Sequence, residues 1–150
     1  MTSETGKKGI TLIEILVVVV IIGLLIGFSV FFPHKAISRI NLDNACKSIC
    51  ETLQTARYYA IAEKQNFRVF FGNNSYGIYR IDGTLVGKVI KLPQFIIIKE
   101  KTDGFSPAEF LPQGTARQAG YLVLQDTSSK KTAKIVLYNL TGKTKIEKNE

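Results

Sequence analysis

The hydrophobic pattern divides the chain into an apolar first part and a mixed second part. From Ile10 to Phe32, 23 consecutive residues contain a single charge, at Glu14. As a helix this run would measure ~35 Å, which is enough to cross a hydrocarbon layer of ~30 Å. A helix is the one form in which a single segment satisfies its own backbone in lipid. The pattern therefore predicts a transmembrane helix over residues 10–32.

A helical pattern resumes after Pro33 and changes its character. Apolar residues now recur at alternating spacings of four and three, which places them on one stripe of an amphipathic helix. The pattern predicts that this continuation covers residues 33–65, ends near Glu63–Gln65, and packs its stripe on the rest of the chain. With the first segment it would form one long N-terminal helix. The stripe consists of Leu42, Cys46, Ile49, Leu53, Ala56 and Ala60.

From Asn66 the pattern changes to short β-rich segments separated by turn sequences such as Gly72-Asn73-Asn74 and Asp82-Gly83. We expect a β domain over residues 66–150, in which one hairpin closes across Pro93-Gln94. The predicted class is α+β, a long N-terminal helix packed on one or more antiparallel β-sheets. The expected strands are Phe67–Phe71, Tyr76–Ile81, Val86–Leu92, Phe95–Glu100, Tyr121–Gln125, Lys134–Tyr138 and Lys143–Ile146.

Chain length and net charge further limit the class of protein and the kind of partner. The chain has 150 residues, which fits one domain, and its net charge is +8 from 20 Lys+Arg and 12 Asp+Glu. A basic protein can meet nucleic acid, anionic lipid or an acidic partner, but here the charge is spread along the chain. With 45% hydrophobic residues the chain does not fit a disordered class, and two cysteines do not make a disulfide-dense scaffold.

The sequence gives little support for catalysis. It contains no P-loop, G-x-S-x-G or H-E-x-x-H motif, and its one histidine, His34, lies beside the apolar segment. Cys46 and Cys50 lie one helical turn apart, where their Cβ vectors do not converge on a disulfide. We expect no catalytic residue, no metal site and no cofactor. The cysteines are interpreted as two small buried residues, or as one buried and one free.

Three interpretations of the apolar segment are open. A cleaved secretory signal has an apolar region of ~7–15 residues followed by a small-x-small site, whereas this run is longer and Phe28–Pro33 offers no such site. An ordinary signal anchor tolerates the length but leaves Glu14 unexplained. A carboxylate inside a membrane segment costs ~2.5–3.5 kcal/mol unless it is paired, so Glu14 is a candidate functional residue.

The third interpretation comes from the residues around Glu14. The sequence Lys7-Lys8-Gly9-Ile10-Thr11-Leu12-Ile13-Glu14 closely resembles the class III signal of type IV pilins and type II secretion pseudopilins. The resemblance implies that prepilin peptidase removes residues 1–9 after Gly9, on the cytoplasmic face, and that Ile10 becomes the methylated N-terminus. This family usually has Phe where the chain has Ile10.

The same resemblance gives Glu14 a partner. In pilin-like proteins the equivalent glutamate pairs with the N-terminal amine of a neighbouring subunit during filament assembly. Amine and carboxylate would each be costly alone in a dry environment, and together they offset one another and set the register between helices. Residues 10–32 would then serve as a filament core as well as a transmembrane helix.

Later segments resemble the minor pseudopilin H family, which includes FimT-like minor pilins (GspH/FimT). The run from Ala56-Arg57 to Gln65 is similar to its AR-x-x-A-I stretch, and Phe110-Leu111-Pro112-Gln113-Gly114 to its F-x-P-x-G element. The segment Gly142-Lys143-Thr144-Lys145 resembles its G-R-x-R ending.

Each of these matches also has a structural explanation. Ala56 and Ala60 allow a helix to pack closely on a sheet, and Gly114 and Gly142 supply turns with positive φ. Arg57 is expected to bond a neighbouring carbonyl or to stay in solvent.

Two functions follow from the resemblance. The first is a minor pseudopilin of a type II secretion system, a structural subunit near the tip of a filament. Its partners would be prepilin peptidase, other pseudopilins or pilins, and the bacterial inner membrane. It would cross that membrane once, with a cytoplasmic N-terminus, as Lys7 and Lys8 favour, and a periplasmic C-terminal domain.

The second function is a FimT-like minor type IV pilin that binds DNA for uptake through Lys143 and Lys145. Lysine attracts phosphate without the bidentate fork of arginine, so such binding would be weak, sequence-independent and salt-dependent. Lys130, Lys131, Lys134 and Lys148 are further basic residues around this tail. A third interpretation is a bitopic envelope protein that joins no filament.

Overall fold

The computed structural model describes residues 11–29 and 34–148, in two units, Met1–His34 and Lys35–Glu150. The first unit contains helix α1 (Leu12–Ser29), and the second contains helix α2 (His34–Glu63) apart from its first residue, together with every strand described. The predicted leader, residues 1–9, lies outside the described residues. So do residues 30–33, at which the long N-terminal helix was expected to continue.

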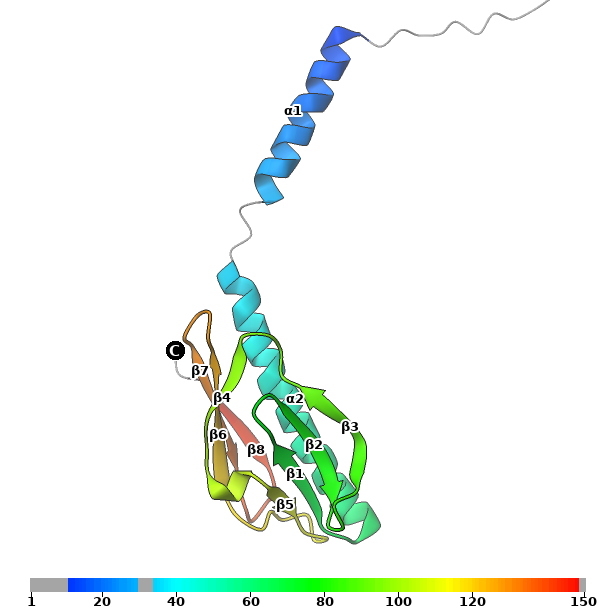
Figure 1. Ribbon diagram of the computed structural model, residues 1–150, viewed down its shortest axis with the longest axis vertical. Coiled ribbons are helices and arrows are strands. Elements are labelled where there is room, and N and C mark those ends of the chain that lie inside the picture. The colour runs from blue at the N-terminus through cyan, green and yellow to red at the C-terminus, as the bar shows by residue number, and fades with distance from the viewer. Residues whose placement is uncertain (1–10, 30–33, 149–150) are drawn as a thin grey trace, which may run out of the picture. The chain divides into compact units, whose positions relative to one another are not determined.

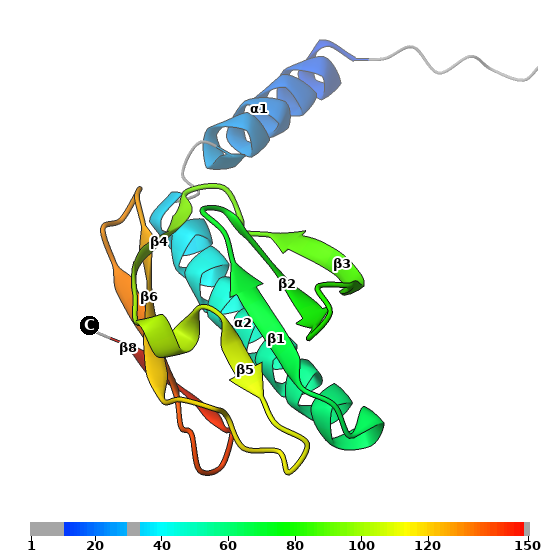
Figure 2. The same ribbon diagram turned by 60° about the horizontal axis from the view of Figure 1, so that its bottom comes forward.

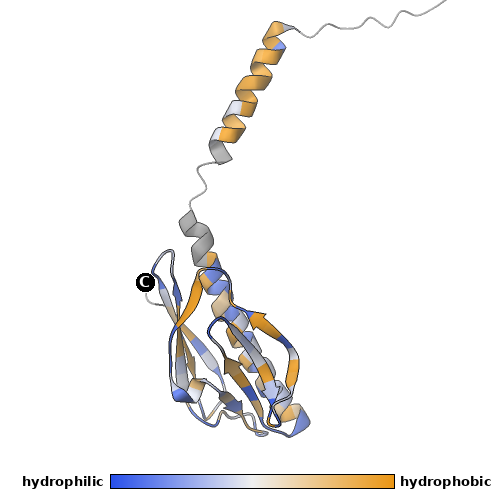
Figure 3. Ribbon diagram, viewed as in Figure 1, coloured by the Kyte–Doolittle hydropathy of each residue, from blue (hydrophilic) through white to orange (hydrophobic). Residues whose placement is uncertain are grey.

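Helix α1 is apolar along most of its length, as Figure 3 shows by hydropathy. Its polar residue near the start is Glu14, and apolar side chains occupy all of its faces. Within the residues that the structure describes, no helix combines the length and the apolarity needed to cross a membrane.

Helix α2 confirms the predicted amphipathic stripe. All six stripe residues are buried in the core of the second unit, because the alternating spacing keeps them on one face. The helix ends at Glu63, inside the expected range. Lys64 follows with φ of 52°, the left-handed conformation that commonly terminates a helix.

The strands form two antiparallel four-stranded sheets. The first sheet has the order β3-β2-β1-β5 and the second has the order β4-β6-β7-β8. A 3-10 turn, η1 (Asp103–Phe105), precedes β5. The strands are β1 (Phe67–Phe71), β2 (Ser75–Arg80), β3 (Leu85–Lys91), β4 (Ile96–Lys101), β5 (Ala108–Phe110), β6 (Gly120–Asp126), β7 (Thr132–Leu137) and β8 (Thr144–Lys148).

The predicted hairpin across Pro93-Gln94 is wrong. Strand β3 pairs with β2 in the first sheet, whereas β4 pairs with β6 in the second. The chain crosses between sheets here because Leu92 and Ile96, on either side of the connection, are both buried in the core. The sequence also missed β5, a three-residue strand with every side chain buried, which pairs with β1.

Helix α2 contacts both sheets, and Figures 1 and 2 show it running along them. On the first sheet, the Tyr76 hydroxyl of β2 bonds Ser48 Oγ of the helix at 2.8 Å. Toward the second sheet, Gln54 Nε2 donates to the Gly142 carbonyl at the turn between β7 and β8, at 3.3 Å. The second unit is therefore α+β, with the core lying between the helix stripe and the inner faces of the two sheets.

Candidate functional site

Three of the five residues assigned to sites by sequence lie in the described part of the chain. Gly9 and Ile10, the predicted cleavage pair and methylation site, lie outside it. Glu14 belongs to α1, Lys143 to the turn before β8, and Lys145 to β8 itself.

Glu14 lies in the first turn of α1, where its side chain is exposed. The backbone N–H of Glu14 donates to the Thr11 carbonyl at 3.1 Å, as the helix begins. A carboxylate in the first turn interacts favourably with the positive end of the helix dipole. The helix thus presents one negative charge at its start, followed by an apolar surface.

That apolar surface is exposed in this chain. The large aliphatic side chains from Leu12 to Ile26 are between 48% and 85% exposed. A helix that is apolar all round is found in the interior of an assembly or in a membrane. The described part of α1 therefore presents an apolar surface on every face.

The C-terminal lysines lie on the turn and strand at one edge of the second sheet. The turn is closed by bonds from the Gly142 N–H to the Tyr138 carbonyl and from the Tyr138 N–H to the Lys143 carbonyl, both 2.9 Å. Gly142 has φ of 60°, which confirms the predicted positive φ. Lys143 is exposed.

Lys145 is exposed but ion-paired. Its Nζ lies 3.1 Å from Glu147 Oε1, two residues along β8 on the same face. The hydrogen bond from Lys145 to Glu147 raises the pKa of the lysine above its usual value. The positive charge at position 145 is therefore offset by a neighbouring carboxylate.

The next strand shows the same compensation. Lys134 of β7 lies opposite Glu147 in the register, and its Nζ lies 4.2 Å from the centre of the Tyr121 ring. The Tyr121 hydroxyl in turn bonds Glu100 of β4, and this bond raises the pKa of the tyrosine. The outer face of the second sheet consequently alternates cations with carboxylates.

The structure does not bring Lys130 and Lys131 together with Lys143. Lys130 and Lys131 belong to the turn before β7, whereas Lys143 belongs to the turn after it. Six residues of β7 separate the two turns, a length of ~20 Å. Figure 1 shows the two turns at opposite ends of the sheet. The sequence grouped these lysines by their closeness in the chain, and an antiparallel hairpin places successive turns at opposite ends.

Of the two alternatives expected for Arg57, a bond to a carbonyl or a position in solvent, the structure shows the bond. Its Nε donates to the Gly114 carbonyl at 2.7 Å. Gly114 has φ of 82°, as predicted for that turn. The residues resembling a family pattern at positions 57, 114 and 142 thus meet at one structural junction between helix and loops.

A buried carboxylate that the sequence analysis missed lies on β5. Glu109 of β5 accepts bonds from Asn66 (2.8 Å), Arg68 (3.1 Å) and Arg117 (2.9 Å). Burial acts to raise the pKa of Glu109, but the bonds from Asn66 and Arg68 and the charges of Arg68 and Arg117 outweigh it, so the pKa lies below its ordinary value. Asn66 and Arg68 lie 43 and 41 residues before Glu109, so no local motif signals the cluster.

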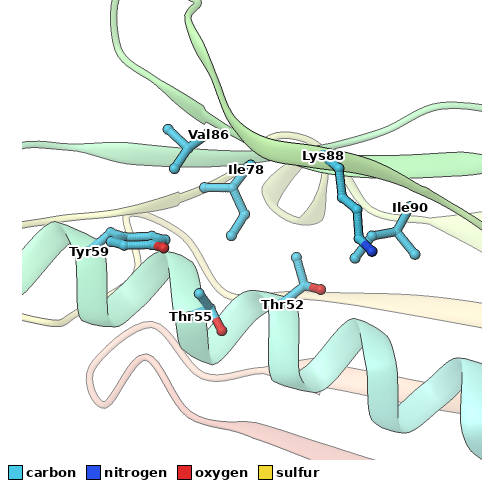
Figure 4. A pocket seen from close by; sticks show the side chains of 8 residues that line it. Thr52, Thr55, Tyr59, Ile78, Val86, Lys88 and Ile90 are labelled. Atoms are coloured by element: carbon cyan, nitrogen blue, oxygen red, sulfur yellow. The ribbon is translucent and has the colours of Figure 1, made fainter.

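The described surface also holds a groove of about 210 Å³ between α2 and the sheet formed by β2 and β3 (Figure 4). Tyr59 and Thr52 of the helix face Ile78 and Lys88 across it. Cys46 is buried and Cys50 half-buried on the same helix, and neither forms a disulfide. Among the described residues, no three His, Cys, Asp or Glu side chains gather as a metal site.

The chain was compared with known protein families and structures. Residues 5–30 match the prokaryotic N-terminal methylation motif. No curated protein matches the chain.

Two solved structures share the fold. The type IV minor pilin FimU of Pseudomonas aeruginosa strain PAO1 has a TM-score of 0.60 and 12% identity, over 73% of this chain and 90% of that one. The minor pseudopilin EpsH from the Type 2 Secretion System of Vibrio cholerae has a TM-score of 0.59 and 11% identity, over 72% of this chain and 97% of that one. The chain is therefore type IV pilin-like: a prokaryotic N-terminal methylation motif leads into a pilin-like fold.

Proposed function

We propose that the chain is a minor pseudopilin of a type II secretion system, a structural subunit near the tip of a filament. The observation that carries this proposal is that α1 is exposed and apolar on every face and holds one carboxylate, Glu14, in its first turn. Prepilin peptidase cuts after Gly9 and leaves Ile10 as a methylated N-terminus. Before assembly, residues 10–32 cross the inner membrane once, with the β domain in the periplasm.

Assembly then transfers α1 from lipid into the filament core. The apolar side chains keep an apolar environment in both places, so the transfer changes their solvation little. Glu14 is costly in either place unless it is paired. The N-terminal amine of a neighbouring subunit supplies the opposite charge, and the pair fixes the axial register of the two helices.

The test compares Glu14→Ala and Glu14→Gln with Glu51→Ala, which removes an exposed carboxylate from α2. Each chain is expressed with prepilin peptidase, and mass spectrometry of the N-terminus reports cleavage and methylation. We expect all three to be cut after Gly9. The two Glu14 variants should be lost from the isolated filament fraction, and Glu51→Ala should be retained. Wild-type incorporation of Glu14→Ala contradicts the proposal.

The alternative is a FimT-like minor type IV pilin that binds DNA. The exposed Lys143 favours it, whereas the pairing of Lys145 with Glu147 weakens it. A fragment of Lys35–Glu150 is titrated with double-stranded DNA at low and physiological salt. Lys143→Ala/Lys145→Ala is compared with Lys130→Ala/Lys131→Ala at the other end of β7. Selective loss of binding in the first variant supports the DNA function.

Deletion of the gene separates the two apparatuses. Impaired protein secretion with normal DNA uptake supports the secretion pseudopilin. Normal secretion with impaired DNA uptake supports the pilus subunit and contradicts the main proposal.

A further inference from the structure

The β3–β4 connection and the β6–β7 turn form one end of the second unit. The Phe95 carbonyl accepts two bonds from Thr127, one from its N–H at 2.8 Å and one from its hydroxyl at 3.1 Å. The Ile96 N–H donates to the Pro93 carbonyl at 3.1 Å, which closes the β3–β4 connection. These bonds hold the two loops side by side.

The loop presents an aromatic side chain to solvent at a strained position. Phe95 has φ of 70° and is 57% exposed. A bulky residue in the left-handed region costs of order 1–3 kcal/mol, and such strain persists where surrounding bonds hold it. Within the chain, the Phe95 ring gains no burial that would offset this backbone strain. We therefore infer that the ring contacts something outside the chain.

The same end is basic. Lys130 and Lys131 on the β6–β7 turn and Lys91 at the end of β3 are all exposed. Asp126, the carboxylate of this turn, is 1% exposed and accepts bonds from Ser128 and Ser129. Its carboxyl group is therefore turned inward, and the lysines face solvent.

This end is also the one at which the chain enters the unit. Tyr76, at the start of β2, bonds Ser48 in the first half of α2, whereas Arg80, at the end of β2, pairs with Glu63 at the end of the helix. The loops beside the start of β2 therefore lie toward the N-terminal end of α2, as Figures 1 and 2 both show. Ile40, near the start of that helix, is exposed as well.

We propose that this end, made of Phe95, Lys91, Lys130, Lys131 and Ile40, docks on an anionic phospholipid surface. The lysines meet headgroup phosphates, and the Phe95 ring enters the boundary between headgroups and acyl chains, as amphipathic membrane-surface elements do. The inference goes beyond the proposed function, because it concerns the second unit alone and holds for either filament system.

The unit Lys35–Glu150 has its own core, so it is tested as a fragment. The probe is co-flotation with vesicles of phosphatidylethanolamine and phosphatidylglycerol, against vesicles of phosphatidylcholine alone. Each lysine near an anionic surface contributes about fivefold in affinity. Lys130→Glu/Lys131→Glu should therefore weaken binding at least about 25-fold. Lys143→Glu/Lys145→Glu, an equal charge change at the other end of β7, should weaken it far less.

The aromatic contact has its own variants. Phe95→Asn introduces a residue that tolerates positive φ and removes the ring. The variant should therefore fold, and it should bind the vesicles about tenfold more weakly. The chain contains no Trp. Phe95→Trp therefore places a single tryptophan in the loop, and its emission should shift to the blue on adding anionic vesicles. Leu140→Trp, at an exposed position on the opposite turn, should not shift.

Two results overturn the proposal. One is equal loss of binding in the two lysine-pair variants, which means that only net charge matters. The other is a blue shift of Phe95→Trp without vesicles that grows with protein concentration, accompanied by dimers in sedimentation. That outcome identifies the face as a contact with a second copy of the chain.

Discussion

The Nε of Arg57 donates a 2.7 Å hydrogen bond to the carbonyl of Gly114, which lies 57 residues further along the chain. Gly142 approaches the same carbonyl so closely that a Cβ there would lie 2.4 Å from the Gly114 oxygen. One junction therefore ties α2 to the loop after β5 and to the turn between β7 and β8. It connects the helix to both sheets at the end remote from Phe95.

Gly142→Ala should destabilise the second unit strongly. The new Cβ would clash with the Gly114 carbonyl and lie 3.0 Å from Arg57 Cδ, and φ of 60° adds backbone strain. We expect a loss of about 3 kcal/mol in the free energy of unfolding. Gly83→Ala is the matched control, because φ is 87° with nothing within 4 Å, and it should cost about 1 kcal/mol. Urea unfolding of Lys35–Glu150 measures both, and equal losses would contradict the clash.

Arg57→Met tests the helix side of the junction. The substitution keeps most of the aliphatic stem and removes the donor to the Gly114 carbonyl. A hydrogen bond from a charged group contributes about 1.5–3 kcal/mol, so we expect a loss near the lower value. Lys47→Met, at an exposed position of the same helix, should stay within about 0.5 kcal/mol of the parent. A loss for Arg57→Met no larger than the control would show that the bond contributes nothing.

Glu109 should make stability depend on acid pH. Its pKa is lowered in the folded chain because its bonds and arginine neighbours outweigh the effect of burial. The stabilisation that the ionised Glu109 provides is complete above the unfolded carboxyl pKa of about 4.3. It is lost as the pH falls through the lower pKa of the folded chain. Glu109→Gln should therefore reduce stability at neutral pH and flatten its decline below pH about 4.3. Urea unfolding across that range checks the slope, with Glu51→Gln retaining the parent profile. If Glu109→Gln lost stability below that pH as steeply as the parent, the acid dependence would not come from Glu109.

The cysteines should react slowly in the folded chain. Burial raises the pKa of the Cys50 thiol, and a bond to Thr144 opposes this only in part. The thiolate is the reactive form, so alkylation of Cys50 by iodoacetamide at mildly alkaline pH should be slower than in urea. Cys46 is 1% exposed and should react more slowly still. Mass spectrometry of Cys46→Ala and Cys50→Ala resolves the two rates. A native rate for Cys50 equal to the unfolded rate would contradict the prediction.

The helical part of the second unit could be predicted from sequence because helix periodicity is local. Spacings of four and three place Leu42 and Ala60 on one face whatever the helix packs against, and both are buried. Turn chemistry is equally local, so positive φ at Gly114 and Gly142 was predictable from residue type. The methylation motif is a contiguous pattern, and the match over residues 5–30 repeats what the sequence indicated.

Strand pairing and charge clustering depended on contacts between distant residues. The placement of β3 and β4 in different sheets was missed because Leu92 and Ile96 follow one another closely yet bury their side chains on either side of a crossover. The lysines at 130, 131 and 143 look like one basic tail, but β7 separates their turns. Glu109 meets Asn66 and Arg68 only after β5 pairs with β1.

The sequence by itself determined the apolar segment, the helix stripe and the turn glycines, because the physics behind each of them acts over a few residues. Tertiary structure alone decided which charges are neutralised and which surfaces are exposed, because both depend on neighbours that folding brings together.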